Sequence, residues 1–226
     1  MYEAIVFDSD GILVEPTDLE LLRAAIRETF EAFGVADPPP DHVEALHHVT
    51  LETVERICAN HGIDPAPFWR HRDDTASRRQ RDAIERGEKP PYPDLEVLRA
   101  FDRPVGVVSN TQHETIRFVL ETFDLAETVA TFYGREHSLD GIRWKKPNPY
   151  YIQRALEDLG TTDALYVGDS QKDIVAANRA GIDSAFVRRP HRQDLELDPE
   201  PTFEVEGLAE LQASLEAESP PTQRDE

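Results

Sequence analysis

The sequence predicts an α/β fold, a doubly wound parallel sheet with an α-helical segment inserted after its first strand. Two observations support this prediction. Beyond Asp94, short valine-rich apolar runs alternate with helical patterns, which is typical of a parallel sheet flanked by helices. Before Asp94, most apolar residues recur at helical spacing. A chain of 226 residues favours one main domain with a sizeable insertion.

The first half of the chain is expected to contain one strand followed by helices. The apolar run within residues 2–7 ends at Asp8-Ser-Asp-Gly11, so a short buried strand opens into a turn with two carboxylates. Helical patterns then cover residues 17–33, 41–58 and 66–85. Gly34 supplies a C-terminal cap for the first of these helices. The proline-rich stretch at residues 90–93 predicts a hinge before the next element.

The second half is expected to supply the rest of the sheet. Its strands are predicted at residues 105–108, 129–133, 164–167 and 184–187. In parallel sheets of this kind, ligands bind beyond the carboxyl ends of the strands, near the switch in strand order. The predicted division is a Rossmann-like core at 1–15 and 89–215, a helical cap at 16–88, and a disordered acidic tail at 216–226.

Composition narrows the range of partners. The formal net charge of −21 would repel nucleic acids and anionic membranes, and no apolar run is long enough to span a bilayer. Without a signal-peptide pattern, the protein is expected in the cytoplasm. Cys58 is the only cysteine and the histidines lack zinc-ligand spacing, which argues against a zinc site. The acid-rich, lysine-poor balance resembles that of proteins from salt-loving (halophilic) cells.

Four short fragments lie at or near predicted strand ends. They are Asp8-Ser-Asp10-Gly11, Ser109-Asn110-Thr111, Lys146-Pro147-Asn148-Pro149 and Gly168-Asp169-Ser170-Gln171-Lys172-Asp173. Each alone is a common turn or helix start. Together, in this order, they resemble the four motifs of the haloacid dehalogenase superfamily. The run Ala-Phe-Gly-Val at residues 32–35 is similar to one in phosphoglycolate phosphatases and beta-phosphoglucomutases, although that match is weaker.

The resemblance implies a phosphatase that works through an aspartyl-phosphate. Asp8 would be the nucleophile, because a carboxylate held in line with phosphorus splits a slow hydrolysis into two faster steps. Asp8, Asp169 and the backbone carbonyl of Asp10 would hold Mg²⁺, a hard cation that prefers oxygen ligands. Asp173 is better placed to orient water beside the metal than to bind the metal itself.

The remaining motif residues are expected to handle protons and phosphate oxygens. Asp10 lies two residues beyond Asp8 on an extended backbone, so its side chain is expected on the same side, where it would act as the general acid and base. Ser109 and the backbone of Asn110 would donate hydrogen bonds to phosphate. Lys146 would add a compact positive charge to the catalytic and phosphate-binding sets.

One residue departs from the family pattern. The family commonly has threonine after Asp-Gly, whereas this chain has Ile12, so a hydroxyl near the nucleophile is absent.

The expected activity is hydrolysis of a small phosphomonoester, phosphoglycolate-like or a sugar phosphate. The alternatives are a phosphosugar mutase and a catalytically weak phosphate-binding protein. The oligomeric state stays undetermined. Cap residues that could contact substrate are His47, His48, Arg72, Arg78, Arg79 and Arg81, although each fits a solvated helical face better.

Overall fold

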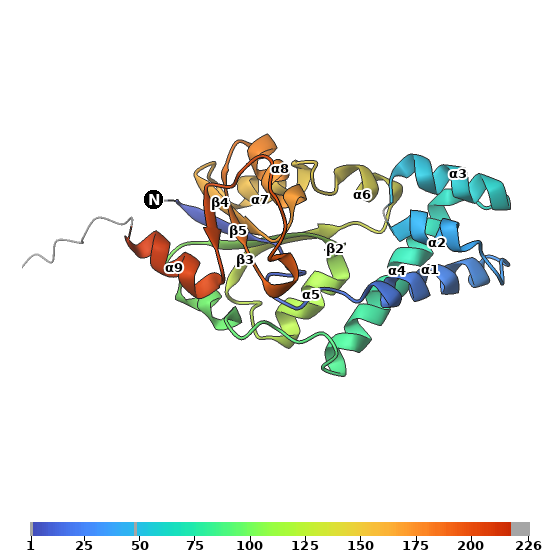
Figure 1. Cartoon of the computed structure of the whole chain (residues 1–226), viewed down its shortest axis with the longest axis horizontal. Helices are drawn as coiled ribbons and strands as arrows, with labels where there is room; N and C mark the ends of the chain where they lie inside the picture. Colours follow the sequence, from blue (N-terminus) through green and yellow to red (C-terminus); the bar gives the residue numbers. More distant parts are fainter. Residues whose placement is uncertain (1, 48, 218–226) are drawn as a thin grey trace, which may run out of the picture.

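The computed structural model describes residues 2–47 and 49–217. Its sheet has six parallel strands in the order β3-β2-β1-β4-β5-β6, which confirms the predicted α/β core (Figure 1). The strands are β1 (Ala4–Phe7), β2 (Val105–Gln112), β3 (Val129–Arg135), β4 (Ala164–Gly168), β5 (Asp183–Val187) and β6 (Phe203–Val205). Because β1 lies between β2 and β4, the carboxyl ends of these three strands meet at one edge. The short strand β6 was not predicted.

Helices cover both faces of the sheet, and alternating β1 side chains divide the core. Ile5 and Phe7 pack on one face, while Ala4 and Val6 pack on the other. The first face is covered by η1 (Leu95–Ala100), α5 (His113–Thr122) and α9 (Leu208–Ala217), and the second by α7 (Tyr150–Leu159) and α8 (Gln171–Ala180). Helix α9 includes Glu216 and Ala217, which the sequence prediction assigned to the tail, while residues 218–226 lie outside the described residues.

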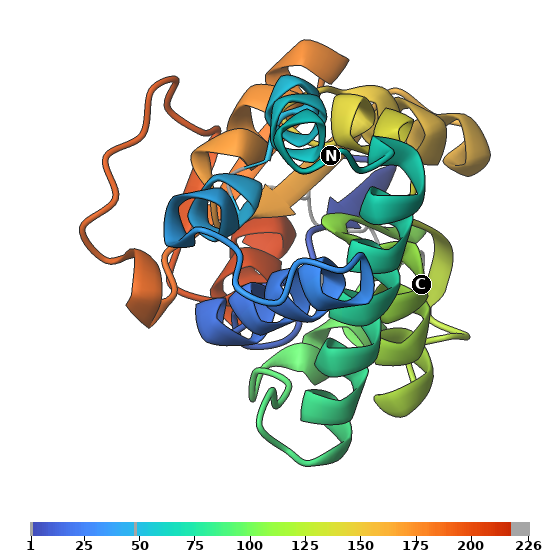
Figure 2. The same cartoon turned by 90° about the vertical axis from the view of Figure 1, so that its right-hand side faces the viewer.

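The segment between β1 and β2 is helical, with α1 (Leu19–Ala32), α2 (Pro40–His47), α3 (Leu51–His61) and α4 (Pro65–Glu85). These helices lie at one end of the molecule, beyond the sheet, and Figure 2 views the molecule from that end. The single helix predicted over 41–58 is two helices. Thr50 starts α3 by accepting a hydrogen bond from the Thr53 amide at 3.2 Å, which satisfies a free amide of the new helix.

The cap helices have their own apolar cluster. It contains Phe30, Leu46, Val54, Trp69 and the buried Cys58, together with Ile142 of the short helix α6 (Leu139–Trp144). Helix α6 therefore packs against the cap although it follows β3 in the chain. Within the described residues, no helix is both long and apolar enough to cross a lipid bilayer.

The two chain segments that join the cap to the sheet run beside each other. The Glu15 amide donates to the Pro90 carbonyl at 3.0 Å, and the Tyr92 amide donates to the Leu13 carbonyl at 3.0 Å. The paired crossings support the proposed boundaries of the cap at residues 16 and 88.

Candidate active site

Asp8 follows β1 directly and lies almost fully buried at the meeting point of the three central strands. Its Oδ1 accepts a hydrogen bond from the Ser9 amide at 2.7 Å, and its Oδ2 lies 3.0 Å from Lys146 Nζ. Burial raises the pKa of the Asp8 carboxyl to about 7, although Lys146 opposes the rise, while Asp173 and Asp169 add to it. A buried carboxylate beside one cation suits a nucleophile that a metal ion would activate further.

Glycines allow the carboxylates to come together. Gly11 has a φ of +85°, and a Cβ there would collide with the Asp169 carboxylate. A Cβ at Gly168 would collide with Asp173. As a result Asp8, Asp169 and Asp173 each bring one oxygen within 4.8 Å of the others. Three buried carboxylates this close repel one another, so the set is chemically fitted to a hard divalent cation such as Mg²⁺.

The three carboxylates differ in how many oxygens the protein already uses. Asp173 Oδ2 accepts from the Ser170 amide at 3.0 Å and the Ser170 hydroxyl at 2.7 Å, and its Oδ1 lies 2.6 Å from Lys146 Nζ. Both oxygens of Asp8 are likewise in contact, with the Ser9 amide and with Lys146. Among the described residues, the donors that contact Asp169 reach only its Oδ2. The role predicted for Asp173, orienting water beside the metal, stays a prediction.

Lys146 is the cation at the centre of the site, with a side chain only 2% exposed. Besides Asp8 and Asp173, its Nζ donates to the Tyr166 hydroxyl at 2.6 Å. Burial lowers the pKa of Lys146, but Asp173 and Asp8 outweigh that effect and hold it well above its usual value. Lys146 therefore stays charged. Its neighbour Lys145 points elsewhere and donates to the Val49 carbonyl at 2.6 Å.

Ser109 and Asn110 lie in the second half of β2, towards its carboxyl end. The Ser109 hydroxyl lies close enough to Asp8 to lower the pKa of that carboxyl. The Asn110 side chain accepts from the Lys146 amide at 2.7 Å and donates to the Lys146 carbonyl at 3.0 Å. The sequence suggested only a backbone role for Asn110. In the structure its amide also fixes the loop that carries Lys146.

The Asp10 side chain contacts the chain segments that lead to and from the cap. Its carboxylate accepts from the Thr17 amide at 3.2 Å and the Thr17 hydroxyl at 2.8 Å, and it forms an ion pair with Lys89. The turn after Ser9 ends the extended backbone on which the expectation depended, because the amides of residues 12–14 all bond to the Ser9 carbonyl. Thr17 and Lys89 lie near the two crossings between cap and sheet, so the Asp10 carboxylate is held beside these crossings.

Ile12 lies in the apolar core. Its side chain is fully buried in the apolar cluster under the sheet. Its carbonyl accepts a hydrogen bond from Arg189 Nη2 at 3.0 Å. The isoleucine therefore adds packing where the family pattern has a hydroxyl.

The cap residues singled out in the sequence lie in different surroundings. Arg72 is buried beside Asp73, and Arg78 and Arg79 pair with Glu28 on the cap. Arg81 and His47 are partly buried. His48 lies outside the described residues. The contacts of Arg72, Arg78 and Arg79 are ion pairs within the protein.

A buried ion cluster joins the cap to the core, and no sequence pattern predicted it. Asp73 of α4 accepts from Arg135 Nη2 at the end of β3 at 2.7 Å, from Arg72 Nη1 at 2.9 Å and from Gln112 Nε2 at 3.1 Å. Arg72 and Arg135 also lie over the Trp69 ring. Burial raises the pKa of Asp73, but Arg135 and Arg72 outweigh it and bring the pKa below its usual value.

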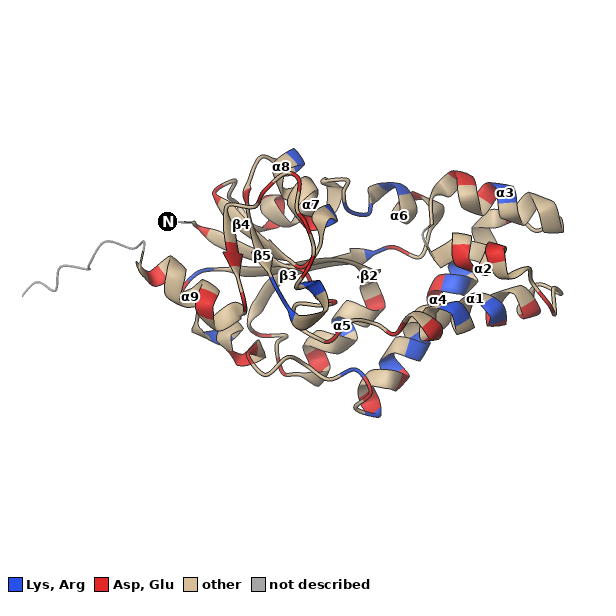
Figure 3. Ribbon diagram, viewed as in Figure 1, with Lys and Arg blue, Asp and Glu red and all other residues tan. Residues whose placement is uncertain are grey.

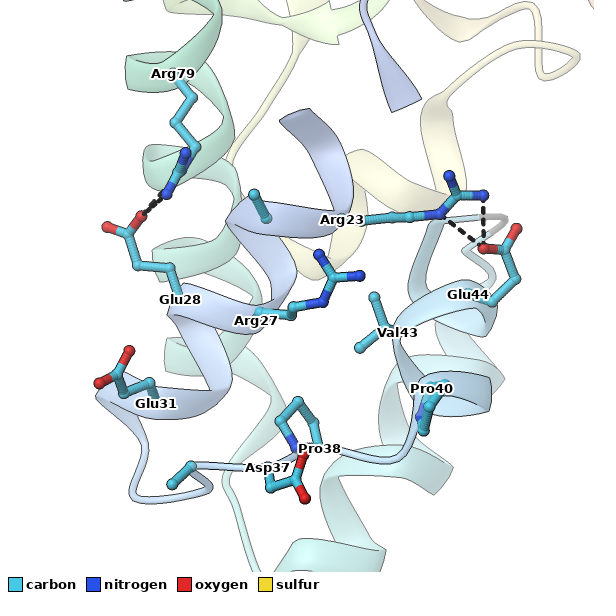
Figure 4. Close-up of a pocket in the computed structure, with 12 residues that line it drawn as sticks. Arg23, Arg27, Glu28, Glu31, Asp37, Pro38, Pro40, Val43, Glu44 and Arg79 are labelled. Carbon is cyan, nitrogen blue, oxygen red and sulfur yellow. Dashed lines mark hydrogen bonds and ion pairs between the residues drawn. The ribbon is translucent and has the colours of Figure 1, made fainter. Parts of the chain in front are cut away.

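A separate cavity of about 760 Å³ opens on the cap between α1 and α2 (Figure 4). Its arginines are already neutralised. Arg23 pairs with Glu44 and Arg79 with Glu28, as Figure 4 shows, and Arg27 pairs with Glu20. This cavity contains none of the four motif fragments, so we assign it no part in the chemistry.

The sequence is similar to those of known hydrolases. The family model of haloacid dehalogenase-like hydrolases matches residues 5–187. A glyceraldehyde 3-phosphate phosphatase of Methanopyrus kandleri is 30% identical, over 93% of this chain and 96% of its own length. A phosphoglycolate phosphatase of Neisseria meningitidis is 28% identical, over 82% of this chain and 80% of its own.

A solved structure extends the likeness to three dimensions. CbbY from Rhodobacter sphaeroides, in complex with phosphate, superposes with a TM-score of 0.68 and 25% identity, covering 93% of this chain and 96% of that one. The resemblance inferred from the four sequence fragments is thereby confirmed. This chain belongs to the haloacid dehalogenase-like hydrolases.

Proposed function

We propose that this protein is a Mg²⁺-dependent phosphatase that hydrolyses a small phosphomonoester through an aspartyl-phosphate at Asp8. The observation that supports this most is the convergence of Asp8, Asp169 and Asp173 within 4.8 Å around the buried Lys146. The phosphatases among its relatives support the same reaction class. A cytoplasmic location stays a prediction.

Asp8, Asp169 and the carbonyl of Asp10 would hold Mg²⁺, which would neutralise charge on the phosphate oxygens. Asp8 attacks phosphorus, and its carboxylate oxygen takes the phosphoryl group as the bond to the leaving oxygen breaks. Ser109 and Lys146 steady the nucleophile and its phosphoryl group by hydrogen bonding and charge. Water then attacks the phosphorus of the aspartyl-phosphate, which releases inorganic phosphate and restores Asp8.

Asp10 would give a proton to the leaving oxygen and later take one from the attacking water. Its carboxylate contacts Thr17 and Lys89, so it would have to leave these partners to reach the substrate. Because those partners lie beside the cap crossings, closure of the cap over substrate could release it. The proposed cap would thereby couple substrate binding to proton transfer.

The test is phosphate release from a panel of sugar phosphates, nucleotides, phosphoglycolate, glyceraldehyde 3-phosphate and pyrophosphate, with Mg²⁺ at high salt. Asp8→Asn should abolish turnover. Asp10→Asn should slow it about a hundredfold or more, because acid-base catalysis is lost, while Mg²⁺ binding persists through the backbone carbonyl. Full activity in either variant would contradict the assignment.

The same panel separates the alternatives. A phosphosugar mutase would interconvert glucose phosphates without releasing phosphate. A phosphate-binding protein would bind phosphate and release none from any ester. The named relatives act on chemically different compounds, so the leaving group is left to the panel to determine.

A further inference from the structure

A short segment after β5 reaches the proposed metal site. It is the 3₁₀ turn η2 (Pro190–Arg192). His191 Nε2 lies 2.7 Å from Asp169 Oδ2, and Arg192 Nε lies 3.0 Å from the same oxygen. Neither residue belongs to the four motif fragments. Burial raises the pKa of Asp169, but the hydrogen bond from His191 and the charge of Arg192 bring it below its usual value.

The turn is anchored firmly beside the nucleophile loop. Arg189, just before it, pairs with Asp94 through two contacts of 2.8 and 2.9 Å. Arg189 also donates to the Ile12 carbonyl at 3.0 Å and lies 3.9 Å above the Tyr92 ring. These contacts tie the turn both to the loop after β1 and to the chain returning from the cap. His191 is thereby presented to Asp169 by a fixed backbone.

The His191 ring can satisfy both of its contacts in one neutral tautomer. With the proton on Nε2, it donates to Asp169, and Nδ1 can accept from the Tyr92 hydroxyl 3.4 Å away. The contact with Asp169 therefore needs no charge on the ring.

The two donors contact only one of the two oxygens of the Asp169 carboxylate. Both His191 and Arg192 contact Oδ2, and Gly11 packs against the same oxygen. In the part of the chain that the structure describes, no protein donor contacts Oδ1. One oxygen is held by the protein, and the other is available as a ligand.

We propose that His191 and Arg192 are positioning residues of the metal site, which fix Asp169 through Oδ2 so that Oδ1 is presented to Mg²⁺. This inference rests on the proposed function, since it takes Asp169 as a metal ligand. Ligating carboxylates are commonly oriented by such partners, and loss of a partner typically costs about 10- to 100-fold in metal affinity. Arg192 also brings a positive charge that opposes the cation, so His191 gives the cleaner test.

The experiment is Mg²⁺ binding to the full chain without substrate, measured by isothermal titration calorimetry. His191→Phe keeps the ring and removes both nitrogens, and we expect Mg²⁺ to bind about 10-fold more weakly or worse. His191→Gln keeps an N–H donor at the reach of Nε2 and should bind nearly as the wild type does. His191→Asn, whose donor is too short to reach Asp169, should behave as His191→Phe does and avoids an apolar ring beside the carboxylates.

Three comparisons decide the outcome. His42→Phe, on cap helix α2, should bind Mg²⁺ as the wild type does. If His191→Phe and His191→Asn bind Mg²⁺ as tightly as the wild type, or more tightly, the inference is overturned. Asp169→Asn identifies where a failure lies. If it still binds Mg²⁺ normally, the proposed metal site is wrong. If it loses binding while the His191 variants do not, only the positioning role is wrong.

Discussion

Replacing Asp73 by asparagine should destabilise the protein strongly, because among the described residues it is the only acid in the buried cluster between cap and core. Its side chain is fully buried, and it accepts hydrogen bonds from Arg72, Arg135 and Gln112. Asp73→Asn leaves two buried guanidinium groups without their counter-charge. Breaking a buried ion pair on one side costs about 3–5 kcal/mol, so we expect a loss of that size at pH 7.

The assay is urea unfolding followed by circular dichroism, with Asp74→Asn as the matched control. Asp74 is the next residue, its side chain is 61% exposed, and it pairs with His137. An exposed pair of this kind contributes about 1 kcal/mol or less. The double variant Asp73→Leu with Arg135→Met, which removes charge on both sides, should recover part of the loss. A loss below about 1 kcal/mol for Asp73→Asn would refute the reasoning.

The pH dependence gives a second readout. Because the folded pKa of Asp73 lies below its unfolded value, its contribution to stability is present above about pH 4 and is lost as pH falls through the folded pKa. The difference in unfolding free energy between wild type and Asp73→Asn should therefore shrink in acid. A difference that stays constant down to the lowest pH at which the protein folds would contradict this sign.

Three further outcomes are expected. In chelator-treated protein, the free energy of unfolding should fall as pH rises from about 4 to 7, because folded Asp8 keeps its proton up to a pKa of about 7. This rise of the pKa by about 3 is worth roughly 4 kcal/mol at most. Asp8→Asn or added Mg²⁺ should make the free energy of unfolding depend less on pH. Ile12→Thr should lower the unfolding free energy by about 1–3 kcal/mol without raising turnover, because it buries a hydroxyl in the core. Raising the KCl concentration should raise the unfolding temperature, because salt screens the repulsion within a chain of net charge −21. The acidic residues are distributed over both cap and core (Figure 3). A lower unfolding temperature in salt would contradict the interpretation that the protein is halophilic.

The sequence predicted the features that depend on local pattern. Apolar runs located five of the strands, and the motif fragments at their ends located Asp8, Ser109 and Asp169. These residues meet because the carboxyl ends of parallel strands share an edge, which makes the site a consequence of the predicted topology. Strand β6 was missed because it has only three residues, and residues 41–58 were read as one helix because the Thr50 cap gives only a weak signal.

The remaining features depend on partners that are distant in sequence. The pairing of Asp73 with Arg135 spans 62 residues, and that of Asp10 with Lys89 spans 79. His191 and Arg192 reach Asp169 from a turn with no motif of its own. Charged residues of this kind are usually solvated, so only the folded structure distinguishes those that are paired in the interior. The contacts of Asp10 with Thr17 and Lys89 were likewise not predicted, because the fold brings these residues together.

The central claim is that Asp8 carries the phosphoryl group during turnover. The most direct test is rapid acid quenching of the enzyme with a hydrolysed phosphomonoester and Mg²⁺, followed by mass spectrometry of the peptide that contains Asp8. We expect a phosphoryl group on Asp8 that forms and decays fast enough to account for turnover, requires Mg²⁺ and is absent from Asp8→Asn. A phosphoryl group on another residue, or continued turnover by Asp8→Asn, would contradict the account.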